Sequence, residues 1–154
     1  TDKSVLQQVL GSLMQRPQLL SEVDKYSLSI TDFSTRFEKY IFSAIMNLYC
    51  KGAVSIQPID VANYLESDTV GSKLFENNHG IEYLQDIVEF SSWENFPYYY
   101  EKLKKLNLIR DLQKQGFDTS QFYCDDLTKK EADEINANFE HLSVTDICNG
   151  DKRK

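Results

Sequence analysis

The residues nearest to a phosphate-binding motif are Gly71, Ser72 and Lys73. A P-loop requires GxxxxGK followed by Ser or Thr, because backbone amides and the lysine together surround the phosphates. Here no strand is predicted before the glycine, and no second glycine lies upstream at the required spacing. The sequence also contains neither GxGxxG nor GxSxG. We therefore expect no nucleotide-binding centre and no catalytic residues in this chain.

The histidines and cysteines lack the spacing of a metal or thiol centre. His79 and His141 lie far apart, and neither has a Cys, His or acidic partner at ligand spacing on a helix, whereas zinc favours a closed set of four ligands. Cys50, Cys124 and Cys148 form no CxxC pair, which is typical of reduced thiols in a cytoplasm. Cys50 borders an apolar stripe and is predicted to be buried. We expect no metal and no cofactor.

Two pairs of adjacent carboxylates, Asp125-Asp126 and Asp133-Glu134, are the remaining candidates for acid–base chemistry. Neighbouring residues on a helix point about 100° apart, and these pairs lie among lysines. They are more typical of a solvated face or a helix N-terminus than of a catalytic pair.

Three consecutive tyrosines, Tyr98 to Tyr100, precede a basic segment and suggest a surface for stacking on nucleobases. Consecutive helical residues face three directions, so the alternative is one tyrosine in the core, one at an interface and one exposed. The acidic chain favours that alternative. We expect at most weak, salt-dependent DNA binding, through four basic residues: Lys102, Lys104, Lys105 and Arg110.

The composition favours a soluble, intracellular, all-α protein. Six glycines and three prolines in 154 residues are about half the usual share, whereas an all-β fold needs a tight turn about every ten residues. The formal net charge of −7 opposes broad attraction to DNA or anionic membranes. No segment approaches the roughly 20 apolar residues of a membrane span. We expect a cytoplasmic protein without a membrane partner.

Apolar periodicity predicts a helical globular subdomain over residues 1–93. Its first helix, residues 5–13, has an apolar arc of about 140°. The strongest pattern runs from Arg36 to Lys51, with Gly52 at the position of a left-handed cap. The polar residues 67–80 are predicted to form a loop, with room for one helical turn around Leu74 and Phe75. Three shorter helices are predicted: one from Pro17 to Val23, one entered through Pro58, and one from Ile81 to Val88.

Residues 94–148 are predicted to form an antiparallel helical hairpin. Its first helix enters through Pro97 and ends near Gln115, and its apolar residues cover about 220° of arc, more than one contact face needs. Thr128 and Glu131 have capping-box spacing at the start of the second helix. The apolar residues of that helix span only about 80°, which suits one partner helix. Residues 149–154 are predicted to begin a linker or a disordered tail.

The charges of the two predicted helices are opposite. Residues 98–115 carry a net charge of +3 and residues 125–140 a net charge of −4, which favours pairing within one chain or between two. Exposed ion pairs contribute only about 0.5 kcal/mol each, so we expect the charges to determine which helices pair and to add little to the stability of the pair. The candidate seam for pairing between copies comprises six residues: Leu103, Leu106, Ile109, Ile135, Phe139 and Leu142.

Five segments follow one another in a recognisable order: Ser4–Met14, Thr31–Phe42, Gly52–Val61, His79–Leu84 and Asn95–Arg110. Their order resembles the N-terminal domain of the DnaB-family bacterial or phage replicative DNA helicases, and Ser4–Met14 is similar to that family's VLGxLL-like opening helix. No single string is specific to the family, but the ordered set covers almost the whole chain.

The resemblance implies a non-catalytic assembly and docking domain. In that family the hairpins pair between neighbouring subunits as dimers, and a trimer of dimers forms the collar of a hexameric ring. The collar receives primase and sometimes a helicase loader. ATP and magnesium belong to a motor domain outside this chain.

Two other functions stay open at this point. One is a primase C-terminal helicase-binding domain or a loader-like adaptor, which has a similar helical plan. The other is a small helical enzyme or a single-strand binder that uses the basic residues after Tyr100.

Overall fold

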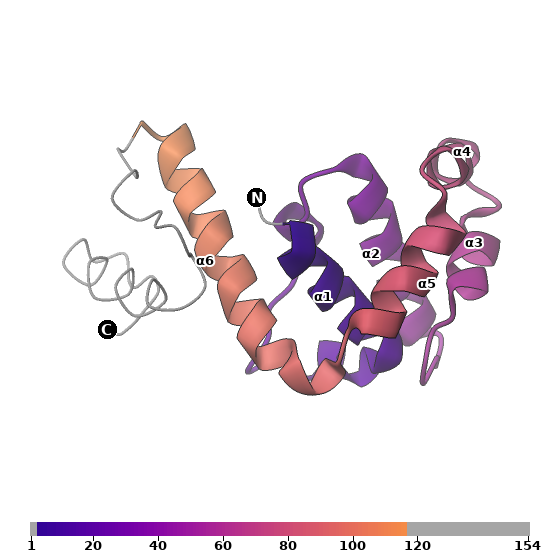
Figure 1. The fold of residues 1–154 in the computed structure, drawn as a ribbon, viewed down its shortest axis with the longest axis horizontal. Helices are drawn as coiled ribbons and strands as arrows, with labels where there is room; N and C mark the ends of the chain where they lie inside the picture. The colour runs from indigo at the N-terminus through magenta and orange to yellow at the C-terminus, as the bar shows by residue number, and fades with distance from the viewer. Residues whose placement is uncertain (1–2, 117–154) are drawn as a thin grey trace. The chain divides into compact units, whose positions relative to one another are not determined.

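The computed structural model describes residues 3–116, and these residues are helical without any strand. The all-α prediction is confirmed for that range (Figure 1). Six α-helices and three 3-10 helices follow one another: α1 (Lys3–Gln15), η1 (Pro17–Ser21), η2 (Ile30–Asp32), α2 (Arg36–Cys50), α3 (Pro58–Leu65), α4 (Thr69–Asn77), α5 (Gly80–Phe90), η3 (Trp93–Asn95) and α6 (Phe96–Lys114).

The chain divides into two compact units, one of residues 3–100 and one that includes the residues from Glu101 onward. Helix α6 begins in the first unit and continues into the second. The predicted boundary between residues 93 and 94 stays a prediction, and the predicted boundary between 148 and 149 lies outside the described residues.

Helix α1 forms the centre of the first unit and contacts α2, α5, η1 and η3. Its apolar residues have no exposed surface, as the predicted stripe requires. Gly11 and Ser12, which lie outside that apolar stripe, are also buried. A Cβ on Gly11 would lie 2.7 Å from the Ile87 carbonyl oxygen and 2.2 Å from Ser91 Oγ, so glycine lets α5 approach α1 closely. Helix α1 is therefore covered on both sides.

Helix α2 confirms the strongest sequence prediction. Thr35 Oγ1 accepts a hydrogen bond from Glu38 N at 3.1 Å, while Thr35 N donates to Glu38 Oε1 at 3.2 Å. This capping box satisfies two backbone donors at the start of the helix. The helix ends at Cys50, and Gly52 follows with φ +104°, a conformation that favours glycine.

The predicted loop over residues 67–80 is wrong, because α4 occupies Thr69–Asn77. Asp68 caps this helix, and its Oδ1 accepts a hydrogen bond from Gly71 N at 2.9 Å. Few residues of the helix are apolar, so the sequence shows no clear helical repeat of apolar positions here. Its buried positions are Gly71, which faces the ring of Tyr40, and Phe75, which lies 6.2 Å from Phe37 between ring centroids. Tertiary contacts therefore hold a polar segment in a helix.

Two smaller predictions are also wrong. The helix entered through Pro17 is a short 3-10 helix that ends at Ser21, and Val23, which was expected on its apolar side, is 72% exposed. Cys50, which was expected to be buried, is exposed because it lies at the last residue of α2. Among the described residues, no helix is long and apolar enough to cross a membrane.

Candidate functional site

An aromatic cluster fixes the start of α6 to the first unit. Tyr26 makes edge-to-face contacts with Phe96 and Tyr100, at 4.8 and 5.0 Å between ring centroids. The Tyr100 hydroxyl accepts a hydrogen bond from the backbone N–H of Ser27 at 2.8 Å. Phe96 is fully buried. The segment that begins the predicted hairpin is thus anchored by packing and by one long-range hydrogen bond.

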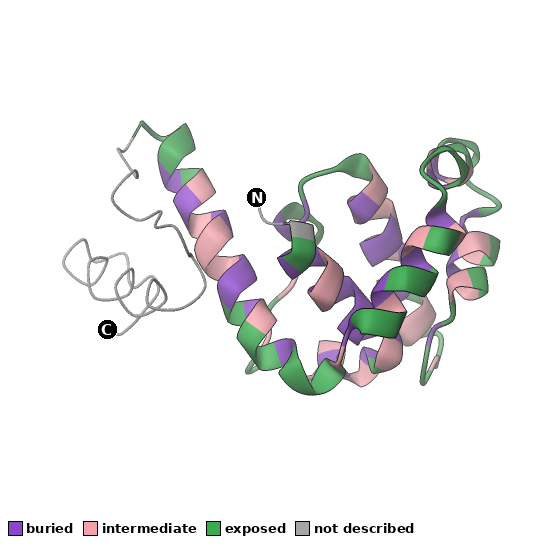
Figure 2. Cartoon of the chain, in the orientation of Figure 1, coloured by how far each residue is buried: buried purple, intermediate pink, exposed green. Residues whose placement is uncertain are grey.

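The buried residues of α6 form two rows on roughly opposite sides of the helix, at about 100° per residue. Figure 2 shows buried positions recurring along the helix. The first row contains Phe96, Tyr100, Leu103 and Asn107, and the second contains Lys102, Ile109 and Leu112. A helix buried on two sides agrees with the broad apolar arc predicted from the sequence.

The predicted seam residues divide between these rows. Leu103 belongs to the first row and Ile109 to the second, and both are fully buried, whereas Leu106 lies between the rows and is half-buried. The other three seam residues, Ile135, Phe139 and Leu142, lie outside the described residues. The pairing of this seam between copies stays a prediction.

The three consecutive tyrosines of α6 differ in burial. Tyr100 is buried, Tyr99 is half-buried, and Tyr98 is 49% exposed. This pattern agrees with the prediction that they face three directions. Among the basic residues that follow, Lys102 is buried, and Lys105 Nζ lies 3.9 Å from Glu101 Oε1. Tyr98 to Tyr100 therefore do not form one flat platform for bases.

Of the residues first considered for phosphate or metal chemistry, Gly71 to Lys73 lie on α4 and His79 directly precedes α5. His141, Cys124, Cys148 and the paired carboxylates at 125–126 and 133–134 lie outside the described residues. Ser72 and Lys73 lie within α4, not on the glycine-rich loop between a strand and a helix that a P-loop requires. His79 adopts a left-handed backbone conformation, with φ +53°, and precedes α5. Within residues 3–116, no group of three His, Cys, Asp or Glu side chains comes together that could hold a metal ion.

A groove of about 420 Å³ lies between α3, α4 and α5, which contact one another in the first unit (Figure 1). Its apolar lining includes Ile59, which is 55% exposed, and Phe75, which is buried. Three exposed carboxylates also line it, from Glu66, Glu76 and Glu82. We refer to these eleven lining residues as the acidic groove: Ile59, Ala62, Asn63, Glu66, Ser72, Phe75, Glu76, His79, Gly80, Ile81 and Glu82.

The sequence reasoning missed the acidic groove because it placed a loop where α4 lies. One signal in the sequence could have indicated it. Residues 58–90 contain seven acidic residues and one lysine, a net charge of −6 against −7 for the whole chain.

Tyr83 on α5 is a half-buried titratable group that the sequence reasoning also missed. Burial and the nearby Glu38 carboxylate raise the pKa of Tyr83 to about 12, and a hydrogen bond from Gln7 opposes that rise. The Tyr83 ring also makes an edge-to-face contact with Phe37, at 5.0 Å between centroids. Gln7 lies on α1, and Glu38 belongs to the capping box of α2. The phenol of Tyr83 on α5 therefore interacts with residues of both other helices.

The raised pKa of Tyr83 predicts a loss of stability at alkaline pH. An unfolded tyrosine ionises near pH 10, while the folded phenol keeps its proton to about pH 12. The unfolded state then binds fewer protons, so the free energy of unfolding falls as the pH rises between these values. Because solvent screens the partly exposed phenol, we expect Tyr83 to contribute about 1 kcal/mol to the loss.

Urea unfolding at pH 9 and pH 11.5 measures this contribution. Tyr83→Phe keeps the ring and removes the ionisable hydroxyl, so this variant should lose less stability between the two pH values than the unmodified chain. Equal losses in the two proteins would contradict the assignment.

Comparison with known proteins identifies the domain. The model of the DnaB-like helicase N terminal domain matches residues 4–105, which include α1 to α5 and the first half of α6. The chain belongs to this family. The resemblance read from the ordered sequence segments is confirmed, and the DnaB-like domain is helical over its described residues, as expected.

A relative extends beyond this DnaB-like domain. The SPbeta prophage-derived uncharacterized protein YorI of Bacillus subtilis (strain 168) is 35% identical over 147 residues. That alignment covers 95% of this chain and 29% of the relative, so the chain spans less than a third of that protein's length. No solved structure matches the chain.

Proposed function

We propose that this DnaB-like domain is the assembly and partner-docking domain of a replicative DNA helicase. The observation that carries the proposal is the family match over residues 4–105.

In the proposed assembly, the hairpin of one copy pairs with the hairpin of a second copy. Three such dimers form a collar on a hexameric ring. Because Leu103 and Ile109 are already buried within one copy, the area buried on pairing comes from Leu106 and from the seam residues predicted on the second hairpin helix. The opposite charges of the two hairpin helices select the pairing. The partners of the collar are primase and, in some systems, a helicase loader.

The domain does no chemistry of its own in this proposal. ATP hydrolysis, which uses magnesium, and movement along DNA belong to a motor domain elsewhere in the same protein. The relative YorI agrees in length with such an arrangement, since its sequence extends well beyond the part that this chain matches.

The downstream coding sequence of the gene tests this function. A helicase requires a GxxxxGK[ST] motif after this domain, because a motor needs that loop to hold its nucleotide. Upstream zinc and polymerase-type domains with no motor downstream would instead establish the primase or adaptor alternative.

A further inference from the structure

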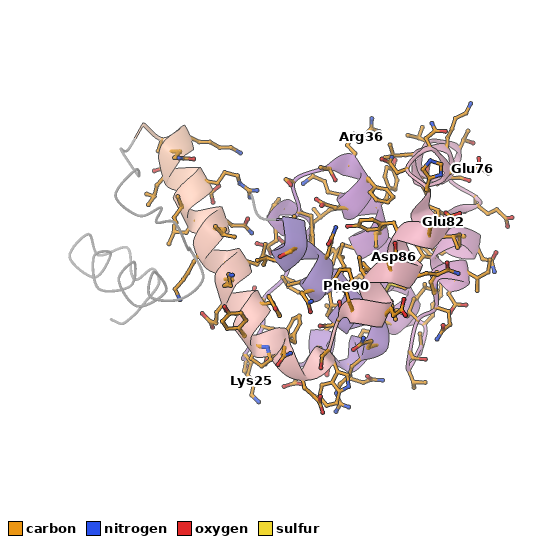
Figure 3. All side chains as sticks on the ribbon, in the orientation of Figure 1. Lys25, Arg36, Glu76, Glu82, Asp86 and Phe90 are labelled. Atoms are coloured by element: carbon orange, nitrogen blue, oxygen red, sulfur yellow. The ribbon has the colours of Figure 1, made fainter. Side chains whose placement is uncertain are left out.

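The segment that forms the acidic groove carries nearly all the net charge of the chain. Residues 58–90 carry a net charge of −6, while the whole chain carries −7. Figure 3 shows Glu76 on α4, with Glu82 and Asp86 following one another along α5. All three side chains are exposed. The field at this surface therefore attracts cations and repels nucleic acid and anionic lipid.

The groove also offers apolar surface beneath these charges. Ile59 on α3 is 55% exposed, although it is a large aliphatic residue. Together with Ala62, Phe75 and Ile81, it lines a volume of about 420 Å³, which falls in the range of roughly 300–1,000 Å³ that is usual for ligand sites. An occupant gains affinity here by inserting apolar side chains.

The carboxylates belong to separate elements around the groove. Glu66 follows the end of α3, Glu76 lies on α4, and Glu82 lies on α5. Among the described residues no three such side chains come close enough to hold one metal ion, so the occupant that complements these carboxylates carries several positive charges spread along its length. It must also present apolar side chains between those charges.

We propose that the acidic groove binds a basic amphipathic helix of a partner protein. Such a helix lays apolar residues at i, i+3, i+4 and i+7 into a groove and keeps its flanks polar. Lysine or arginine on those flanks would pair with Glu66, Glu76 and Glu82. Charge complementarity of this kind speeds encounter and excludes acidic partners.

This inference rests on the docking part of the proposed function and specifies the chemistry of the partner. It does not depend on the pairing of the hairpins, because every lining residue belongs to the first unit. The site of assembly and the site of docking are therefore separate surfaces that can be tested separately.

A designed peptide tests the proposal with the whole 154-residue chain. The probe is a fluorescent helical peptide of about 18 residues with leucine at i, i+3, i+4 and i+7 and lysine on both flanks. Its binding is followed by fluorescence anisotropy at an ionic strength of about 0.15 M. The control peptide carries glutamate in place of lysine and should not bind.

Two pairs of substitutions separate the groove from general charge attraction. The double variant Glu76→Lys with Glu82→Lys reverses two groove carboxylates, and we expect it to raise the peptide's Kd about 10-fold or more. The double variant Asp24→Lys with Glu89→Lys makes the same change in net charge at exposed residues outside the groove. We expect this control to raise the Kd less than about 3-fold.

A third variant tests the apolar part of the groove. Ile59→Ala should also weaken binding, because it removes exposed aliphatic surface without changing charge. Circular dichroism checks that each variant is folded. If the charge reversal prevents folding, Glu76→Gln with Glu82→Gln takes its place and should still weaken binding.

The outcomes decide the proposal. Loss of binding in the groove variants and its retention in the control support it. Equal weakening by both charge pairs, no effect of Ile59→Ala, or no binding at all overturns it. Light scattering on the same samples distinguishes the two proposals. A monomeric chain that binds the peptide contradicts only the pairing of hairpins. An assembled chain that does not bind the peptide contradicts only the groove proposal.

Discussion

Replacing Phe139 with aspartate is expected to dissociate the assembled domain into monomers. Phe139 is the aromatic residue of the narrow seam predicted for the second hairpin helix. Removing a packed phenylalanine costs about 3–5 kcal/mol, and a carboxylate at the same position must be desolvated as well. Since each 1.4 kcal/mol corresponds to a tenfold change, the dissociation constant should rise about 100-fold or more.

The neighbouring residue His141 provides a matched control. His141→Asp introduces the same side chain about 200° away on the predicted helix, outside the narrow apolar arc. This variant should assemble like the unmodified chain when both are compared by sedimentation velocity. If the two aspartate variants dissociate equally, or neither does, the seam has been assigned to the wrong face.

Truncating Phe96 to alanine is expected to destabilise the first unit by about 3–5 kcal/mol. The Phe96 side chain is fully buried and packs edge-to-face on Tyr26. Its loss leaves a cavity in the cluster that anchors the start of α6. Because a domain of this kind has a total stability of only about 5–15 kcal/mol, the variant should unfold at a much lower urea concentration.

Tyr98→Ala is the control for that measurement. Tyr98 lies two residues farther along α6 and is 49% exposed, so its truncation should cost less than about 1 kcal/mol. Urea denaturation monitored by circular dichroism compares both variants with the unmodified chain. An equally small effect of Phe96→Ala would show that the aromatic cluster does not anchor α6.

The sequence predicted those helices whose apolar residues repeat with a clear period. Helix α2 begins at the predicted residue Arg36 and ends one residue before the predicted Lys51, and Gly52 adopts the predicted left-handed conformation. Helix α4 could not be predicted in this way. Its stability depends on contacts with Tyr40 and Phe37 of another helix, and such contacts leave no period in the segment's own sequence.

The candidate surfaces were predictable to different degrees. The broad apolar arc of the first hairpin helix indicated burial on two sides, and α6 has two buried rows. The acidic groove needs three helices to come together, one of which was predicted as a loop. Only the bias of residues 58–90 toward Asp and Glu was visible beforehand, and charge alone does not reveal a groove.

The solution mass of the unmodified chain, measured by light scattering across a wide concentration range, tests the assembly proposal most directly. We expect a dimer or a hexamer that persists on dilution, because the seam buries apolar surface between copies. A mass that stays at the monomer value of 17.9 kDa at the highest concentration would contradict the claim that this domain assembles through its own hairpin.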